Sequence, residues 1–243
     1  MDIVFDLGSN FTKLGIFKED NLLYNTALKN NEIGKIVDIL NLNPDIKKGI
    51  ISSVSAKEKE IANILINSNI PFIYLDQNTN IPIKNSYQSA TLGKDRLAAA
   101  IGANLLYPKQ NLLILDFGTA ITIDFINKNN EYIGGNISPG LSSRFWVLNK
   151  KSDYLPLLKA SETFETTGKT TESAIINGVQ NGIIFEINSY INIYKKKYIN
   201  LKVIATGGDA VFFEKKLKNT IFVVSNLVLI GLHRILRYNE ENH

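Results

Sequence analysis

The sequence contains no cysteine and only two histidines in 243 residues. Without cysteine the chain can form neither a disulfide bond nor a thiolate metal site, and it has no thiol nucleophile. Zinc sites and histidine-based catalysis usually use several histidines, and one of the two here, His243, is the last residue printed. We therefore expect a protein that does not depend on thiol, zinc or histidine chemistry.

Long apolar runs are also absent. No stretch reaches the roughly 18 residues that predict a membrane-spanning helix. The chain leads directly into the apolar run Ile3–Phe5, without the basic start and cleavage pattern of a secretory signal. A hydrophobic content of 44% and a charged content of 21% are typical of globular proteins. We expect a cytoplasmic protein that does not bind membranes.

Arginine is scarce, and the positive charge is dispersed. The formal net charge is +4, yet the chain has only four arginines, and its one tight basic cluster is Lys195–Lys197. A nucleic-acid surface usually carries a denser basic stripe, with arginines or aromatic residues between the lysines. The lysine cluster is better explained as the end of a helix, where the helix dipole favours cations. We expect no nucleic-acid partner.

A ten-residue pattern occurs twice, at residues 3–12 and 113–122, with a constant offset of 110. Each copy is an apolar strand that ends in an aspartate, followed by a glycine turn with a small hydroxyl residue and then a second strand. The equivalent residues are Asp6 and Asp116, Gly8 and Gly118, and Ser9 and Thr119. Two such hairpins, one in each half, are expected of a nucleotide-binding protein built by duplication.

The two turns carry the chemistry of a phosphate site. Glycine lets amide N–H groups approach phosphate oxygens without a Cβ in the way. Possible donor side chains at the turns are Ser9, Asn10, Thr12, Lys13 and Thr119. An aspartate facing a polyphosphate would be repelled unless a cation lay between them, so the pattern predicts Mg²⁺ or a similar hard cation. One copy alone would be better explained as an ordinary hairpin turn.

Strands and helices are expected to alternate along both halves. Strands are expected near residues 2–8, 11–18, 21–28, 49–54, 72–75, 112–117, 120–126, 131–138 and 202–205. Helices are expected near residues 32–42, 56–67, 96–106 and 171–197, after Gly140 and after Asn226. Residues 76–92 are polar and rich in turn formers, which predicts a substrate loop. We expect an α/β protein with two lobes, residues 1–108 and 109–243, each with a mixed sheet flanked by helices.

The repeated strand-strand-strand-helix order resembles the duplicated, ribonuclease H-like fold of the actin, heat-shock ATPase and sugar kinase superfamily. Further segments resemble type III pantothenate kinases and follow that family's order along the chain. They are Tyr87 with Gly93–Arg96, Asp116–Thr122, Gly134–Gly140, Leu155–Pro156 with Gly168–Thr171, and Ala205–Gly208. The resemblance implies two related domains that close around ATP, with the phosphates between the two hairpins.

Two places depart from the usual pattern of that family. Ser9 and Asn10 stand where its first turn commonly has asparagine and threonine, and Ala90 stands where it often has proline. Because the replacements keep the donors or the shape, we expect activity to be retained.

The resemblance implies a reaction and a set of site residues. The reaction is the ATP-dependent phosphorylation of pantothenate to 4′-phosphopantothenate, the first step of coenzyme A biosynthesis, with Asp95 as the general base. Asp116 is implied to hold a monovalent cation, K⁺ or NH₄⁺, that the family requires beside Mg²⁺. The implied pantothenate-binding residues are Tyr87, Gly93, Lys94, Asp95, Arg96 and Thr171. The implied ATP-binding residues are Asp6, Leu7, Gly8, Ser9, Asn10, Phe11, Thr12, Lys13 and Thr119.

In that family the residue equivalent to Thr171 comes from the neighbouring subunit, which implies an obligate homodimer with composite active sites. Simpler interpretations also exist for three of these residues. Asp95 could cap the helix that follows it, Thr171 could be the N-cap of the long helix, and Arg96 could form a surface ion pair.

Two other functions are compatible with parts of the sequence. Asp6–Asn10 also resembles the start of exopolyphosphatases of the same superfamily, but Asp116–Thr119 lacks their Gly-Gly-Gly-Ser type of second motif, and those enzymes tend to be longer. The chain could also be a catalytically idle relative that acts as a regulator. The presence of Asp6, Asp95 and Asp116 argues against that alternative. An assay of ADP release with and without pantothenate distinguishes the three functions.

Overall fold

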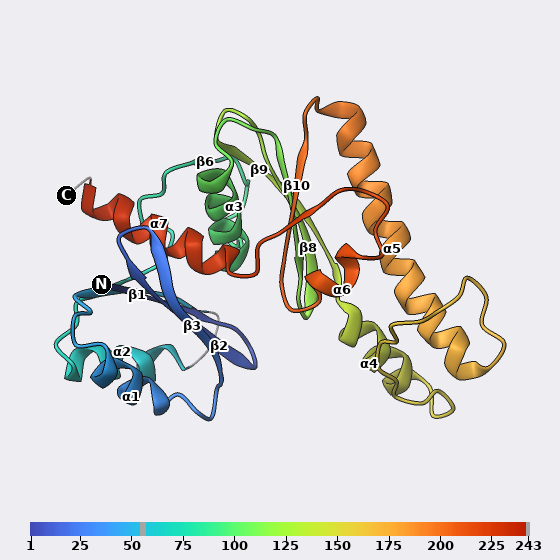
Figure 1. Ribbon diagram of the computed structural model, residues 1–243, viewed down its shortest axis with the longest axis horizontal. Helices are drawn as coiled ribbons and strands as arrows, with labels where there is room; N and C mark the ends of the chain where they lie inside the picture. The colour runs from blue at the N-terminus through green and yellow to red at the C-terminus, as the bar shows by residue number, and fades with distance from the viewer. Residues whose placement is uncertain (54–56, 242–243) are drawn as a thin grey trace. The chain divides into compact units, whose positions relative to one another are not determined.

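The computed structural model describes residues 1–53 and 57–241. Contacts divide the chain into two compact units (Figure 1). Unit 1 consists of Met1–Leu106 and Asn226–His243, and unit 2 consists of Tyr107–Ser225. Across the described residues, no helix is both long and apolar enough to cross a membrane.

Unit 1 is built on a mixed sheet of five strands in the order β3-β2-β1-β4-β5. The strands are β1 (Asp2–Leu7), β2 (Phe11–Lys18), β3 (Asn21–Lys29), β4 (Lys48–Ser53) and β5 (Phe72–Tyr74). β1 pairs antiparallel with β2 and parallel with β4. A short strand, β6 (Lys84–Asn85), lies in the long polar loop that precedes the third helix.

Helices cover both faces of this sheet (Figure 1). They are α1 (Lys35–Leu42), α2 (Glu58–Asn67), α3 (Lys94–Leu106) and α7 (Leu227–Glu241). Alternate residues of β1, namely Ile3, Phe5 and Leu7, form a buried cluster with apolar residues of α1 and α2. α3 and α7 lie on the opposite face. The period-two pattern of β1 therefore fixes which face each helix pair covers.

The crossing of α3 and α7 depends on two glycines. A Cβ on Gly231 would clash with the carbonyl oxygen of Ala98, and a Cβ on Gly102 would lie 3.1 Å from the backbone nitrogen of Gly231 and closer still to the carbonyl of Leu227. The two helix backbones therefore touch at a distance that only glycine permits. This contact places α7 in unit 1, although the sequence analysis assigned it to a second lobe of residues 109–243.

Unit 2 repeats the arrangement of unit 1. Its strands are β7 (Leu112–Phe117), β8 (Ala120–Ile126), β9 (Glu131–Pro139), β10 (Lys202–Thr206) and β11 (Phe222–Val223). Their order, β9-β8-β7-β10-β11, is equivalent to the order β3-β2-β1-β4-β5 of unit 1. In both units an antiparallel hairpin lies next to parallel strands. The helices of this unit are α4 (Leu141–Lys151), α5 (Thr171–Lys197) and α6 (Ala210–Glu214). The predicted duplication is confirmed.

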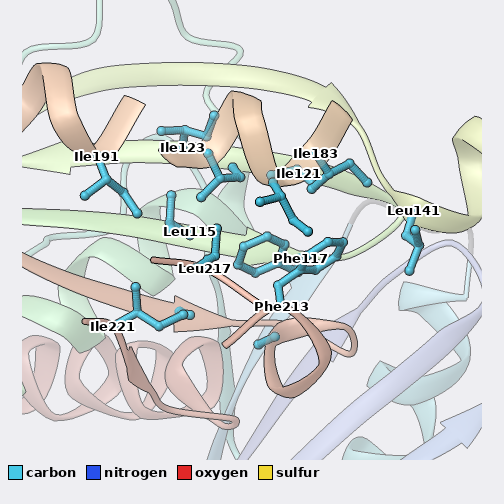
Figure 2. Packing of buried hydrophobic residues seen from close by; sticks show 14 of the residues in the cluster. Leu115, Phe117, Ile121, Ile123, Leu141, Ile183, Ile191, Phe213, Leu217 and Ile221 are labelled. Atoms are coloured by element: carbon cyan, nitrogen blue, oxygen red, sulfur yellow. The ribbon is translucent and has the colours of Figure 1, made fainter. Parts of the chain in front are cut away.

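The core of unit 2 lies between its sheet and helices α4, α5 and α6. Figure 2 shows Phe117 of β7 against Phe213 of α6, and their stacked rings have centroids 5.0 Å apart. Ile183 and Ile191 of α5 are fully buried in the same cluster. Isoleucines at this spacing share one face of the helix, so α5 is held to the sheet by that face.

Most expected elements are confirmed within two or three residues. The long helix is Thr171–Lys197, as predicted. α3 begins at Lys94 rather than at residue 96, so Asp95 lies inside the helix. The short elements β6, α6 and β11 were not predicted. Parts of two expected elements, at residues 54 and 56, lie outside the described residues.

A buried hydrogen bond ties α7 to the first strand. His233 Nε2 lies 2.9 Å from Asp2 Oδ2, and the imidazole stacks on the ring of Phe17 with centroids 4.1 Å apart. Lys48 Nζ lies 3.7 Å from the other carboxylate oxygen of Asp2. Burial, the largest single effect, raises the pKa of Asp2, but the hydrogen bond from His233 and the nearby charges, of which Lys48 has the largest effect, together lower that pKa.

The change Asp2→Asn tests this pair. We expect it to lower the free energy of unfolding by about 1–2 kcal/mol at neutral pH, because the negative charge that strengthens this buried hydrogen bond is lost. A lowered folded-state pKa means that the ionised Asp2 stabilises the fold above about pH 4 and that this stabilisation is lost as pH falls through the folded pKa. In urea unfolding, the free energy of unfolding should therefore differ most between the wild-type protein and the variant at neutral pH, and this difference should shrink in acid. A difference that does not change with pH would contradict the assignment.

Candidate active site

The first turn joins β1 to β2. The N–H of Gly8 donates to the carbonyl of Phe11 at 3.0 Å, which closes a four-residue turn, and the side chains of Ser9 and Asn10 are exposed. Asp6 is half-buried just before the turn and lies opposite the exposed Lys13 on β2. The turn therefore presents its polar groups to solvent at the end of a buried strand.

Two residues expected to contact ATP point inward. Leu7 is 1% exposed and Thr12 is fully buried. The Thr12 hydroxyl donates to Asn30 Oδ1 at 3.0 Å. Any contact of Leu7 or Thr12 with a ligand would therefore come from the backbone.

Asn30, which the sequence analysis did not identify, holds the first turn from behind. Its Nδ2 donates to the carbonyl oxygens of Gly8, at 3.2 Å, and Ser9, at 3.0 Å. Its backbone N–H donates to the carbonyl of Asn10 at 3.2 Å. The only sequence signal for this residue is its place directly after the third strand of the meander, because asparagine is frequent throughout the chain.

The second turn, between β7 and β8, is one residue shorter. The N–H of Gly118 donates to the carbonyl of Ala120 at 3.1 Å. Thr122 therefore pairs with Asp116, whereas Lys13 pairs with Asp6. The predicted constant offset of 110 is therefore wrong for the residues that follow Gly8 and Gly118. Thr122 is the structural equivalent of Lys13 rather than of Thr12.

The second turn is also held from behind, by the segment that starts α4. The N–H of Gly140 donates to the carbonyl of Thr119 at 3.0 Å, and the Ser143 hydroxyl donates to the same oxygen at 2.6 Å. A Cβ on Gly140 would lie 2.7 Å from that oxygen and would clash with the carbonyl of Gly118. The Thr119 side chain itself is exposed. Gly140 is thus needed because the backbone at the start of α4 contacts the backbone of the second turn.

Asp116 lies beside the late glycine turn. Gly207 has φ +93°, and a Cβ there would clash with Asp116 Oδ1 and lie 2.5 Å from the carbonyl of Phe117. Asp116 is half-buried. Among residues 1–53 and 57–241, no three acidic or histidine side chains gather as a metal cluster. A cation here would take ligands from the Asp116 carboxylate and from phosphate, backbone or water oxygens, which Mg²⁺ and similar hard cations accept.

The expected substrate element lies at the start of α3. Asp95 is exposed, and its Oδ1 accepts the N–H of Arg96 at 2.9 Å, so this carboxylate does cap the first turn. A Cβ on Gly93 would lie 2.6 Å from that same oxygen. Arg96 is 5% exposed, and its guanidinium carbon lies 5.6 Å from the ring centroid of Tyr87. Arg96 is therefore buried and not a surface residue, contrary to the surface location that the ion-pair alternative assumed.

The loop before α3 encloses a cavity of about 360 Å³. Tyr87 and Lys94 line it, together with polar side chains of Asp76, Gln77 and Thr79. The polar loop expected to bind a substrate therefore does form a hollow next to two of the predicted substrate residues.

Thr171 is the first residue of α5 and is exposed. The N-cap is Thr170, whose hydroxyl accepts the N–H of Ser173 in a capping box. The alternative that Thr171 caps the helix is therefore wrong, and its side chain is not used in the cap. Thr171 and Arg144 help to line an apolar cavity of about 690 Å³ formed by α4 and α5.

A further carboxylate near the second turn was not identified from the sequence. Asp209 follows the late glycine pair and lines a cavity of about 800 Å³ together with Thr119, Ser143, Trp146 and Lys159. Burial raises the pKa of Asp209. The feature of the sequence that could have identified Asp209 is its position directly after Gly207-Gly208.

The predicted residues thus form two groups. Asp6–Lys13, Tyr87 and Gly93–Arg96 belong to unit 1, and Asp116, Thr119 and Thr171 belong to unit 2. Within unit 1, Tyr87 and Arg96 are in contact, and within unit 2, Asp116 contacts the late glycine turn.

Comparison with known proteins gives one consistent family. The model of the type III pantothenate kinase family matches residues 3–193. A type III pantothenate kinase of Cytophaga hutchinsonii is 39% identical over 240 residues, covering 98% of this chain and all of the relative. Those of Flavobacterium psychrophilum and Phocaeicola vulgatus are 38% and 40% identical, each covering 99% of this chain and all of the relative.

Solved structures agree on the fold. A Baf family transcriptional activator from Campylobacter jejuni has a TM-score of 0.65 at 25% identity and covers 98% of this chain and 99% of its own. A polyphosphate/ATP-glucomannokinase from Arthrobacter has a TM-score of 0.52 at 14% identity, covering 99% of this chain and 98% of its own. At this identity the second likeness concerns the fold alone, which is the duplicated fold of actin and sugar kinases.

The paired glycines beside Asp116 provide a stability test. We expect Gly207→Ala to lower the free energy of unfolding by about 2 kcal/mol or more, because the residue has a positive φ and its Cβ would meet Asp116. Gly208→Ala is the matched control. No atom lies within 4 Å of its Cβ position, so the change should stay within about 0.5 kcal/mol. Equal effects of the two variants in denaturant unfolding would contradict the packing described here.

Proposed function

The chain belongs to the type III pantothenate kinase family and catalyses the ATP-dependent phosphorylation of pantothenate, and we propose that Asp95 is the general base of this reaction. The observation that carries the proposal is the full-length match to these kinases, together with an exposed aspartate in the first turn of α3. The reaction begins coenzyme A biosynthesis, and we place it in the cytoplasm as part of the same proposal.

Asp95 would take the proton of the primary hydroxyl of pantothenate as that oxygen attacks the γ-phosphorus of ATP. The P–O bond to ADP breaks as the new P–O bond forms, and the proton passes to the carboxylate. Because phosphoryl transfer is loose, the base mainly orients the hydroxyl and accepts its proton late. The Asp95 carboxylate uses one oxygen to cap α3, which holds the group in place and leaves the other oxygen for the substrate.

Arg96 and Tyr87 would position the substrate. Arg96 is buried against the Tyr87 ring, so its guanidinium is held in one place rather than free to move. A fixed guanidinium suits two-pronged binding of the pantothenate carboxylate or hydroxyls. Gly93 and Lys94 would complete this part of the site beside the loop cavity.

The two Asp-x-Gly turns would hold the phosphates of ATP. Residues Asp6–Lys13 would contribute from unit 1, and Thr119 from unit 2. Both turns have carbonyl groups tied back within their own units, which leaves amide N–H groups for phosphate oxygens. The exposed side chains of Ser9 and Thr119 can add neutral donors.

Asp116 would hold a monovalent cation, K⁺ or NH₄⁺, and Mg²⁺ would accompany the ATP. The half-buried Asp116 carboxylate provides the oxygen ligands that a hard cation prefers. Such cations neutralise phosphate charge. This chain supplies the Asp116 carboxylate, against which the backbone of Gly207 packs closely.

We also propose a homodimer in which Thr171 contacts the pantothenate bound to the partner subunit. The outer faces of α4 and α5 expose large apolar side chains, among them Trp146 at 53% and Phe185 at 59%. Apolar surface of this kind is typical of permanent interfaces. Thr171 is available for such a contact because Thr170 and Ser173 form the helix cap.

The change Asp95→Asn tests the base. We expect kcat to fall by about a hundredfold or more, because the amide cannot accept the proton. Binding of ATP and of pantothenate should remain within about threefold, because the Asn oxygen can still cap α3. ADP release with and without pantothenate and calorimetric binding are the measurements. Asp38→Asn, which alters an exposed carboxylate in the first turn of α1, is the control and should retain activity. Unimpaired turnover in Asp95→Asn would remove this residue from the mechanism.

Dependence on a monovalent cation tests Asp116. We expect pantothenate-dependent ADP release to fall by about tenfold or more when K⁺ and NH₄⁺ are replaced by Na⁺ at equal ionic strength. Asp116→Asn should be slow in both buffers and should no longer respond to K⁺. Full activity of the wild-type protein in rigorously K⁺- and NH₄⁺-free sodium buffer would show that the carboxylate has another role.

A further inference from the structure

We propose that Asn30 is a positioning residue for the ATP phosphates, because it holds the Gly8–Asn10 turn so that the amide N–H groups of the turn face the nucleotide. This inference rests on the proposed role of the turn in ATP binding. It assigns a role to a residue outside the segments that resemble the family. It also means that the Thr12 side chain acts on Asn30 and does not contact the nucleotide.

Asn30 forms hydrogen bonds through both its side-chain amide and its backbone N–H. Its Nδ2 donates to the carbonyls of Gly8 and Ser9, and its backbone N–H donates to that of Asn10. Three successive carbonyl oxygens of the turn therefore point toward one residue.

The planarity of the peptide bond then fixes the other side of the turn. In a trans peptide the carbonyl of one residue and the N–H of the next point in opposite directions. With the carbonyls of Gly8 and Ser9 held by Asn30, the N–H groups of Ser9 and Asn10 point away from it. Within residues 1–53 and 57–241 no protein acceptor takes either N–H. Adjacent N–H groups that face the same way form a binding place for anionic oxygens.

Thr12 sets the orientation of the Asn30 side chain. The Thr12 hydroxyl is fully buried and donates to Oδ1 of Asn30 at 3.0 Å. This bond requires the oxygen of the amide to face Thr12 and the NH₂ group to face the turn. The reverse orientation would place the amide oxygen against two carbonyl oxygens. Thr12 therefore acts through Asn30 and not by a side-chain contact with the nucleotide.

Strand pairing brings Asn30 to the turn. Lys29, the last residue of β3, pairs with Phe11 on β2, so the next residue lies beside the turn. The second turn reaches a similar result by other means, since Gly140 and Ser143 hold the carbonyl of Thr119. Each Asp-x-Gly turn is therefore held within its own unit, and in the first turn a single side chain has this role.

The change Asn30→Ala is the principal test. We expect the Kd for ATP and the KM for ATP to rise by about tenfold, because two hydrogen bonds that hold the turn are lost. The KM for pantothenate should stay within about twofold. Calorimetric titration with ATP in the absence of pantothenate measures the first quantity directly. That measurement does not depend on which substrate is phosphorylated, so a failure of this inference is distinguishable from a failure of the proposed function.

Asn43→Ala is the matched control. Asn43 is also half-buried in unit 1, and its Nδ2 also donates to a backbone carbonyl, that of Ile39 at 2.8 Å. We expect this variant to lose a comparable amount of thermal stability and to bind ATP like the wild-type protein. If Asn30→Ala likewise lowered the melting temperature but left the Kd for ATP unchanged, Asn30 would have only a structural role and the inference would be overturned.

Two further variants test the direction of the hydrogen bonds. Asn30→Asp keeps the acceptor for Thr12 but faces the carbonyls of Gly8 and Ser9 with an oxygen, so we expect it to bind ATP no better than Asn30→Ala. Thr12→Val removes the donated hydroxyl, and we expect a twofold to fivefold loss of ATP affinity. Combined with Asn30→Ala, the second change should have almost no further effect. Additive losses in the double variant would mean that Thr12 acts independently of Asn30.

Discussion

The hydrogen bonds that hold the carbonyls of the two Asp-x-Gly turns are the interactions on which the proposed site depends. A turn of small residues at the end of a strand has many accessible conformations, and only some direct its N–H groups to one side. Asn30 restricts the first turn, and the start of α4 restricts the second. Because these donors come from within each unit, each half of the proposed phosphate site is preorganised before any ligand binds.

Glycine has a second use in this protein, which is to allow close contact between segments. Gly140 brings the start of α4 against the second turn, and Gly207 brings the late turn against Asp116. Gly102 and Gly231 let α7 cross α3, the helix whose first turn carries Asp95. The glycine-containing segments that resemble the family are therefore explained in part by packing. A side chain at these positions would displace a functional group even if it never touched a ligand.

Much of the fold could be predicted from the sequence because its signals are local. Apolar runs that end in Asp6 and Asp116 fixed both hairpins, and the isoleucine spacing fixed α5. Two things could not be predicted. The turn lengths differ by one residue, and this is decided by which backbone groups pair across the hairpin rather than by the side chains. The role of Asn30 comes from strand pairing that places it beside a turn about 20 residues earlier in the chain. Likewise, the placement of α7 depends on a glycine contact between segments far apart in sequence.

The duplication provides two equivalent hairpins, and the differences between them bear on the roles proposed for each. The longer first turn has two exposed polar side chains and a lysine across from its aspartate, which suits the most highly charged part of a nucleotide. In the second turn the equivalent of that lysine is Thr122, and the aspartate is instead crowded by a glycine with a positive φ. In the proposed site Asp116 would hold the monovalent cation, and the residue that pairs with it on β8 is a threonine rather than a lysine. On this proposal, one copy of the repeated motif presents a lysine opposite its aspartate, and the other copy would take its cation from solution.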